Sequence, residues 1–325
     1  MQRSRIPASA SAVAGTLAVM PKEVELPDSK WTDIDGPVHY REWPGPEGLT
    51  FVCVHGLGGS LLNWIAVAPE LSRMGRVLAV DLAGFGLTAR EGRSASVFAN
   101  RRLFSRFISE VPDGPVVLVG NSMGGAISIL QAAREPESVA GLILTSPALP
   151  VRPRALPKFM VLYGFAVLQV PEIGERTLRR RWSRLGAERL VEETFKMCCV
   201  DPSRIDEAII ALHVEGARRR ETNPDAIPAF LEATRSLMRL ATNPRRGRAV
   251  LEGVRCPVLL IQGREDRLVN VRTAIAVARQ HPDWELCVLD GVGHVAQLEA
   301  PDRWLAEVRD WIASRPSLAS LAAAS

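Results

Sequence analysis

Short apolar runs alternate with segments of helical periodicity over most of this 325-residue chain. Many of the runs are rich in valine, isoleucine and leucine and end in glycine or aspartate, which is typical of buried strands. We expect an early antiparallel strand at 38–43, further strands at 50–54, 77–80, 116–119, 141–146, 257–262 and 284–289, and helices at 64–71, 95–110, 126–133 and 301–314. Strands that alternate with helices predict an α/β fold with a parallel sheet covered on both faces.

This alternation is interrupted between about residue 147 and residue 250. Four prolines, at positions 147, 150, 153 and 157, mark the departure from the sheet. Beyond them we expect helices and no clear strand, at 159–170, 187–199, 204–219 and 228–240. The segment 159–170 is apolar on nearly every side, which predicts burial or contact with an apolar ligand.

The sequence around Ser122 combines a strand, a tight turn and the start of a helix. Residues 120–124, Gly-Asn-Ser-Met-Gly, fit the pattern G-x-S-x-G in that context. The turn places the Ser122 hydroxyl at its tip. It also places the N–H of Met123 at the free start of the helix, where it can donate to an oxyanion. The alternative interpretation is a serine that caps an ordinary helix.

A second glycine-rich turn, residues 55–59, follows the strand at 50–54. Its glycines let the backbone approach a ligand closely and direct N–H groups toward it. We interpret the N–H of Leu57 as a second oxyanion donor, with a plain strand-to-helix turn as the alternative. We expect His55, and Asp81 in the next strand-end loop, to have structural roles in their turns.

Asp266 and His294 add two further chemical types at strand ends. A serine hydroxyl is a poor nucleophile at neutral pH and needs an adjacent base, a role that imidazole suits. A carboxylate on the second ring nitrogen fixes the tautomer and stabilises the imidazolium. The order Ser122, Asp266, His294 is the order expected after a nucleophile turn of this kind. Glu265 competes with Asp266 for the position of the acid.

Together these motifs resemble the α/β-hydrolase superfamily. The resemblance rests, in this order, on the segments 55–59, 81–86, 120–125, 263–266 and 290–294. Its G-x-x-D spacing favours Asp266 over Glu265. It implies a mostly parallel eight-stranded sheet formed by 26–147 and 249–315, with a helical cap inserted at 148–248. It also implies hydrolysis through an acyl-serine, without a metal ion or an organic cofactor.

The details of these motifs narrow the activity that the resemblance implies. Ser122 stands where the similar epoxide hydrolases and haloalkane dehalogenases carry an aspartate nucleophile. The turn 120–125 and the sequence Gly-His-x-Ala-Gln at 293–297 are similar to carbon–carbon bond hydrolases of aromatic ring cleavage. Those enzymes commonly have an aromatic residue where Val295 stands, and their glycine turn usually differs from 55–59. We therefore expect hydrolysis of a carboxylic ester.

The expected substrate is a small, apolar and lipid-like ester. We expect it to contact Gly56 in the core, Val295 beside the histidine, and Phe159 and Tyr163 in the cap. The alternatives are a carbon–carbon bond hydrolase of a ring-cleavage type diketone, an acyltransferase, a cofactor-free oxygenase, and a binding protein without activity.

The charge of the chain is uneven. Its formal net charge is +4, but residues 151–250 carry 19 Lys and Arg against 12 Asp and Glu. The basic runs 179–181 and 218–220 lack interleaved aromatic residues, and the chain has no recognised nucleic-acid motif. We expect solvated helix faces and no nucleic-acid partner, with peripheral contact to an anionic membrane or attraction of acidic substrates as the alternatives.

The cysteine pattern favours a reducing, cytoplasmic compartment. There are five cysteines, two of them adjacent and none in a C-x-x-C pair, which argues against a disulfide framework and a zinc site. Residues 1–25 make a poor signal-peptide core, and we expect them to be disordered, like the alanine-rich tail 316–325. No apolar run is long enough to span a bilayer. The oligomeric state is left open.

Overall fold

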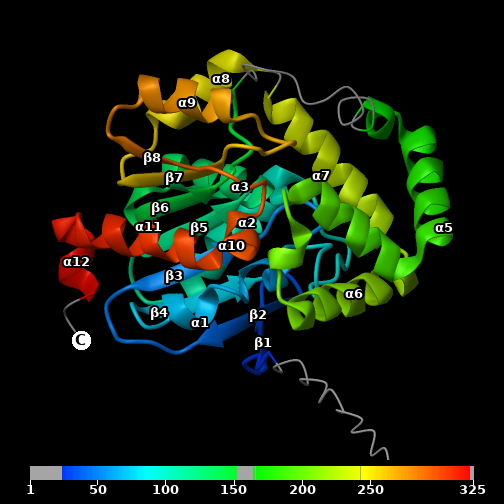
Figure 1. Cartoon of the computed structure of the whole chain (residues 1–325), viewed down its shortest axis with the longest axis horizontal. Coiled ribbons are helices and arrows are strands. Elements are labelled where there is room, and N and C mark those ends of the chain that lie inside the picture. Colours follow the sequence, from blue (N-terminus) through cyan, green and yellow to red (C-terminus); the bar gives the residue numbers. More distant parts are fainter. Residues whose placement is uncertain (1–23, 152–163, 165, 242, 323–325) are drawn as a thin grey trace, which may run out of the picture.

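The computed structural model describes residues 24–151, 164, 166–241 and 243–322, and its centre is an eight-stranded sheet (Figure 1). The strands lie in the order β1-β2-β4-β3-β5-β6-β7-β8. Strands β3 to β8 are parallel, whereas β2 is antiparallel to both of its neighbours. The predicted fold class is thereby confirmed. The bounds are β1 (Ser29–Asp33), β2 (Pro37–Trp43), β3 (Thr50–Val54), β4 (Arg76–Val80), β5 (Val116–Asn121), β6 (Val139–Thr145), β7 (Val258–Gly263) and β8 (Trp284–Leu289).

Alternate residues of the central strands face two separate hydrophobic cores. In β3, Val52 and Val54 belong to the first core and Phe51 and Cys53 to the second, as the two-residue period of a strand requires. The first core is completed by α2 (Val97–Glu110), α3 (Met123–Arg134), α8 (Pro244–Glu252) and α9 (Val271–Gln280). The second is completed by η1 (Leu61–Trp64), α1 (Ala68–Leu71), α10 (Ala296–Glu299) and α11 (Pro301–Ala313). Burial on both faces explains why these strands are continuous apolar runs.

Of the helices described between β6 and β7, three stand beside the sheet, and we call them the cap (Figure 1). They are α5 (Pro171–Cys198), α6 (Glu207–Thr222) and α7 (Ala226–Ala241). Helix α5 breaks at Gly186, where φ is 66°. Glu232 of α7 joins the cap to the core. Its carboxylate accepts hydrogen bonds from the side chains of Arg90 and Ser94 and from the N–H of Ala95.

The expectation of a disordered tail from residue 316 is wrong. Pro316–Ala322 form helix α12, which begins at a proline, a residue favoured at the first helical position. Leu318 is only 1% exposed and belongs to the second core together with Trp311 of α11. Gly141 of β6 leaves room for both, since a Cβ there would lie 3.1 Å from the Trp311 ring. The apolar residues of this segment therefore cover the sheet.

The expectations for the leader at 1–25 and for the helix at 159–170 concern segments that the structure describes only in part. Val24 and Leu26 pack against the second core, so a disordered leader does not extend to residue 25 as expected. Residues 1–23 lie outside the described part of the chain. The helix expected at 159–170 also lies outside it, apart from 164 and 166–170, of which 164 and 166–169 are helical.

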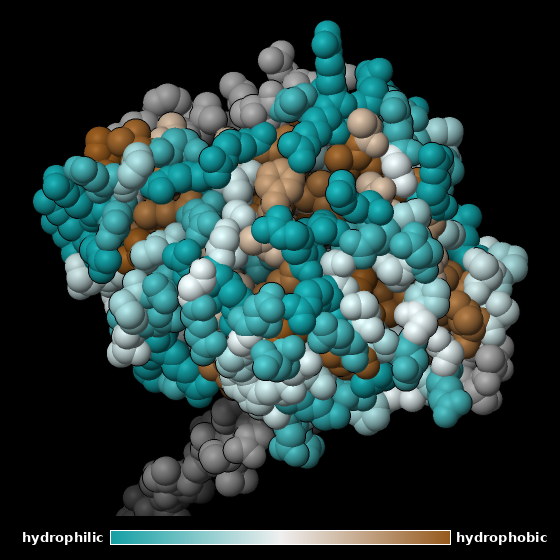
Figure 2. Space-filling view, turned by 180° about the vertical axis from the view of Figure 1, so that it is seen from behind, coloured by the Kyte–Doolittle hydropathy of each residue, from teal (hydrophilic) through white to brown (hydrophobic). Residues whose placement is uncertain are grey.

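The surface carries its apolar residues in small groups. Figure 2 shows hydrophobic residues in separate patches among hydrophilic ones on one face of the molecule. None of the helices in the described ranges is long and apolar enough to cross a membrane.

The contact of α12 with the sheet predicts a measurable contribution to stability. Replacing Leu318, which is buried, by Ala should lower the free energy of unfolding by about 2–4 kcal/mol, because it removes buried methyl groups and leaves a cavity. Leu321 on the same helix is 37% exposed, so Leu321→Ala is a matched control that should change it by less than about 0.5 kcal/mol. Urea denaturation measures both. Equal, small effects would show that α12 does not pack on the core in solution.

Candidate active site

Ser122 occupies a strained turn between β5 and α3. Its φ of 54° and ψ of −114° lie outside the conformations that residues with a side chain usually adopt. The flanking glycines make the turn sterically feasible. A Cβ on Gly124 would lie 2.1 Å from the Val54 carbonyl oxygen, and one on Gly120 would lie 2.7 Å from the carbonyl oxygen of Gly124. The turn therefore has the shape that the pattern predicted.

His294 and Asp266 form a buried hydrogen-bonded pair. His294 Nδ1 lies 2.8 Å from Asp266 Oδ2, and the two residues are 4% and 7% exposed. The second carboxylate oxygen accepts from the N–H groups of Leu268 and Val269. Burial by itself raises the pKa of Asp266, but the charge and hydrogen bond of His294, with these N–H groups, bring it below its ordinary value of 3.8. The carboxylate is therefore ionised, and His294 donates from Nδ1, which leaves Nε2 free to accept a proton.

Asn121 connects the serine turn to the histidine loop. Its Nδ2 donates to the carbonyl oxygen of His294 at 3.1 Å and to that of Thr145 at 3.0 Å. Among the contacts of the described residues, no hydrogen bond joins the Ser122 hydroxyl to the His294 ring. Asp266 and His294 are thus paired directly. Ser122 is connected to the loop of His294 through the side chain of the preceding residue, Asn121. Such contacts are often long in the absence of substrate and shorten when substrate binds.

The glycine-rich turn at 55–59 lies against Ser122. A Cβ on Gly56 would be 3.2 Å from the Ser122 Cβ, so the backbone approaches the serine as closely as the pattern implied. The N–H of Gly59 closes the turn by donating to the Gly56 carbonyl oxygen, which leaves the Leu57 N–H outside that bond. Met123 is the first residue of α3, so its N–H has no partner within the helix. Met123 thus follows Ser122 with an available N–H, and Leu57 follows the glycine that packs against the serine, while their role as oxyanion donors stays a prediction.

His55 and Asp81 hold the surrounding loops, as expected. His55 Nε2 accepts from the N–H of Leu82, and its Nδ1 therefore donates to the Gly56 carbonyl oxygen. Burial lowers the pKa of His55, which keeps its ring neutral. Asp81 accepts from the N–H groups of Leu61 and of residue 87, and its Oδ2 lies 2.8 Å from His39 Nδ1.

Glu299 is a residue near the site that sequence reasoning missed. Its side chain is fully buried and accepts three backbone hydrogen bonds. One comes from Gly293, next to His294, and two come from Val200 and Asp201 at the end of the cap helix α5. In addition, the N–H of His294 donates to the Cys198 carbonyl oxygen at 2.6 Å. Hydrogen bonds therefore connect the loop that carries His294 to the end of the cap helix α5.

Gln262 is a second residue that the sequence did not single out. It ends β7 near Asp266, and its Nε2 donates to Asp266 Oδ2 at 3.0 Å and to the Val269 carbonyl oxygen at 3.1 Å. These bonds fix the carboxylate oxygen that faces His294. The only sequence signal is a polar residue at the end of an otherwise apolar strand.

The expected substrate contacts are described only in part. Gly56 and Val295 are buried, Gly56 against Ser122 and Val295 in the second core. Phe159 and Tyr163 lie outside the described residues. All five cysteines are free thiols, and the described segments hold no group of His, Cys, Asp or Glu arranged to bind a metal ion.

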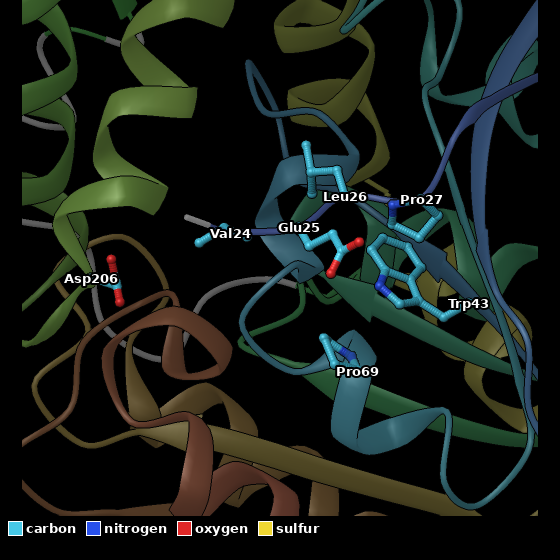
Figure 3. Close-up of a pocket in the computed structure, with 7 residues that line it drawn as sticks. All are labelled: Val24, Glu25, Leu26, Pro27, Trp43, Pro69 and Asp206. Atoms are coloured by element: carbon cyan, nitrogen blue, oxygen red, sulfur yellow. The ribbon is translucent and has the colours of Figure 1, made fainter. Parts of the chain in front are cut away.

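A cavity of ≈ 520 Å³ lies elsewhere on the molecule, between the N-terminal segment and the start of the cap helix α6 (Figure 3). None of the predicted site residues lines it. Its lining residues are Val24, Glu25, Leu26, Pro27, Trp43, Pro69 and Asp206. We therefore do not assign the substrate to this cavity.

Comparison with known proteins places the chain in a family. The profile of the family described as "alpha/beta hydrolase fold" matches residues 50–301. Monoglyceride lipase of Rattus norvegicus is 27% identical over 288 residues, covering 84% of this chain and 85% of that protein. The 2-hydroxy-6-oxo-6-(2'-aminophenyl)hexa-2,4-dienoic acid hydrolase of Metapseudomonas resinovorans is 27% identical over 292 residues, covering 89% and 92%. The crystal structure of Cfl2 from Burkholderia cenocepacia has a similar fold, with a TM-score of 0.74 and 20% identity over 87% of this chain and 95% of that one.

The hydrogen bonds between Glu299 and the loop of His294 predict that Glu299 affects kcat. Glu299→Ala leaves three N–H groups unpaired, of which that of Gly293 is buried, and should lower the free energy of unfolding by about 3–5 kcal/mol. Glu299→Gln keeps one acceptor oxygen, so we expect a smaller loss of stability but a fall in kcat of about 10-fold, because the loop of His294 loosens. Denaturation and steady-state kinetics measure the two effects. Asp290→Asn, in the same loop but exposed, is the control, and equal kcat values for both variants would contradict a positioning role.

The lowered pKa of Asp266 predicts how stability depends on pH. Because the folded-state pKa lies below the unfolded value near 3.8, the stabilisation is present above about pH 4 and is lost as the pH falls through the folded-state pKa. Asp266→Asn should remove this component, so the difference in unfolding free energy between wild type and variant should shrink from pH 6 to pH 3. Its kcat should fall by about 10⁴. Glu265→Gln, at the competing acid, touches only the hydrogen bonds from the N–H groups of Gly291 and Val292 and should lower kcat by about 10-fold at most, and the reverse result would reassign the acid.

Proposed function

This chain belongs to the alpha/beta hydrolase family, and from that premise we propose that it hydrolyses a carboxylic ester through an acyl intermediate on Ser122. The observation that carries the proposal is the buried Asp266–His294 pair beside a serine held in a strained turn. A hydroxyl, an imidazole and a carboxylate in this order form a nucleophile, a general base and a group that orients the base.

In the proposed acylation, His294 Nε2 takes the proton of the Ser122 hydroxyl while the oxygen attacks the ester carbonyl carbon. The carbonyl oxygen becomes an oxyanion that accepts hydrogen bonds from the N–H groups of Leu57 and Met123. The tetrahedral intermediate then collapses, and the bond to the alcohol oxygen breaks. The imidazolium returns its proton to that oxygen, so the alcohol leaves neutral and the acyl group stays on Ser122.

Deacylation repeats the sequence with water as the nucleophile. His294 takes a proton from water, the hydroxide oxygen attacks the acyl carbon, and the same two N–H groups stabilise the oxyanion. Ser122 leaves with the proton from His294, which frees the carboxylic acid. Asp266 keeps its charge throughout and stabilises the imidazolium in both halves.

Two observations favour ester hydrolysis over the alternatives. One is the similarity to a lipase, and the other is the absence of an aromatic residue directly after His294. The relative from Rattus norvegicus is a monoglyceride lipase by name. Val295 stands beside the histidine, where we expected an aromatic residue in a carbon–carbon bond hydrolase. The second candidate remains such a hydrolase, because several relatives of about equal identity have ring-cleavage products in their names.

The proposal predicts that Ser122 is an activated nucleophile. A fluorophosphonate probe should label wild type at Ser122, and Ser122→Ala should lose labelling and about 10⁴–10⁶ in kcat toward aryl esters. Ser109→Ala is a control, since this hydroxyl is exposed and bonds only to the Arg106 carbonyl oxygen of its own helix. Wild-type turnover by Ser122→Ala would refute the proposal. Turnover of vinylogous diketones with no turnover of esters would favour the second candidate, and new esters formed with added alcohols would indicate acyl transfer.

A further inference from the structure

Helix α6 ends in three consecutive arginines that differ in their partners. Arg218 forms ion pairs with Glu188 and Glu215, and Arg219 pairs with Glu215. Arg220 forms no ion pair with any residue in the described ranges. The segments outside those ranges contain one acidic side chain, Glu23. Among the described residues, Arg220 is therefore a cation without a counter-charge, at the end of a helix whose other two terminal arginines are neutralised.

The guanidinium of Arg220 lies at the predicted oxyanion turn. Its Nη1 donates to the carbonyl oxygen of Gly58. Gly58 is two residues from Gly56, which packs against Ser122, and two residues of chain span at most about 7 Å. Phe230 of α7 covers the turn from the other side, since a Cβ on Gly58 would lie 3.0 Å from its ring. The charge thus sits next to the place where an ester would bind.

Arg220 is partly buried at this position. Burial lowers the pKa of its guanidinium, and no carboxylate offsets the effect. The same positive charge lowers the pKa of His55 beneath the turn, after burial itself. It also contributes, again after burial, to the lowering of the pKa of His213 to about 4. A partly buried charge without a counter-charge among the described residues attracts an anion, so a ligand that supplies the opposite charge gains binding energy there.

A purely structural role explains only part of this arrangement. A guanidinium has five N–H donors in a planar fork, and the bond to the Gly58 carbonyl oxygen uses one of them. That bond links the cap to the core but neutralises no charge. The fork matches a carboxylate or a phosphate, which can accept two parallel hydrogen bonds.

We propose that Arg220 binds a carboxylate or phosphate group carried by the substrate, so that the preferred esters are amphiphiles with one anionic group near the scissile bond. This assignment rests on the proposed ester hydrolysis at Ser122. It names the class of substrate that the cap selects.

Matched pairs of esters test the preference of the wild-type enzyme. On the acyl side, 4-nitrophenyl monoglutarate is anionic and 4-nitrophenyl pentanoate is neutral and of similar length. On the alcohol side, a 1-acylglycerol 3-phosphate is anionic and the corresponding monoacylglycerol is neutral. We expect wild type to have the higher kcat/KM for the anionic member of one pair, and that pair identifies whether the acyl or the alcohol part carries the charge.

Variants at the end of α6 then test whether Arg220 is the residue responsible. Arg220→Met keeps the apolar stem and should lower kcat/KM for the preferred anionic ester by about 10- to 100-fold. It should change that for the neutral partner by less than about 3-fold. Arg220→Lys keeps the charge without the fork and should lie between the two. Arg219→Met, the exposed neighbour, is the matched control and should leave both values unchanged.

The possible outcomes distinguish an anion-binding role of Arg220 from a structural one. Equal losses for the anionic and neutral esters in Arg220→Met would show a tether and overturn the proposal, as would a wild type that does not prefer either anionic ester. If Arg220→Met does not fold, the wild-type preference and the Arg220→Lys variant give the answer. Failure of the proposed function differs from all of these, because wild type would then cleave no ester and Ser122 would not react with the fluorophosphonate probe.

Discussion

The hydrogen bond between Asp266 and His294 is the interaction around which the site is arranged. It joins two loops that leave neighbouring strands β7 and β8 at the same edge of the sheet. The carboxylate is held by Gln262 and by two backbone N–H groups, so the ring has one orientation available. Ser122 reaches the same edge because the turn after β5 forces its backbone into a rare conformation. A parallel sheet thus collects three distant segments without any one of them being adjacent in sequence.

The cap forms hydrogen bonds with loops of the core at the ends of the strands. The Cys198 carbonyl oxygen at the end of α5 accepts the N–H of His294, and Glu299 of α10 joins the same loop to residues 200–201 just beyond α5. Glu232 holds the loop before α2 from α7, and Arg220 reaches the turn at Gly58 from α6. Each of the three cap helices therefore contacts a different loop at the strand ends.

Local patterns predicted much of this molecule, and long-range contacts account for most of what they missed. The strands and the turn at Ser122 are encoded by apolar runs and by glycines at fixed offsets, which are readable one segment at a time. Glu299 gave no such signal, because its partners at 200–201 are about a hundred residues away. The part of α5 before Gly186 was not expected either, because its few apolar residues, such as Leu178 and Trp182, stand among charged ones and pack only against distant residues of the cap. The sequence of helix α12 resembles a disordered tail because its few apolar residues are buried only through long-range contacts with Trp311 and β6.

The break in α5 at Gly186 divides the cap into two parts with different attachments. The part after the break ends at Cys198 and Cys199, where backbone bonds fasten it to the loop of His294. A swing of this part would pull the imidazole away from its aspartate. The glycine at the break separates the backbone of the earlier part from this attachment, so the two parts of the helix are not bound to share one position.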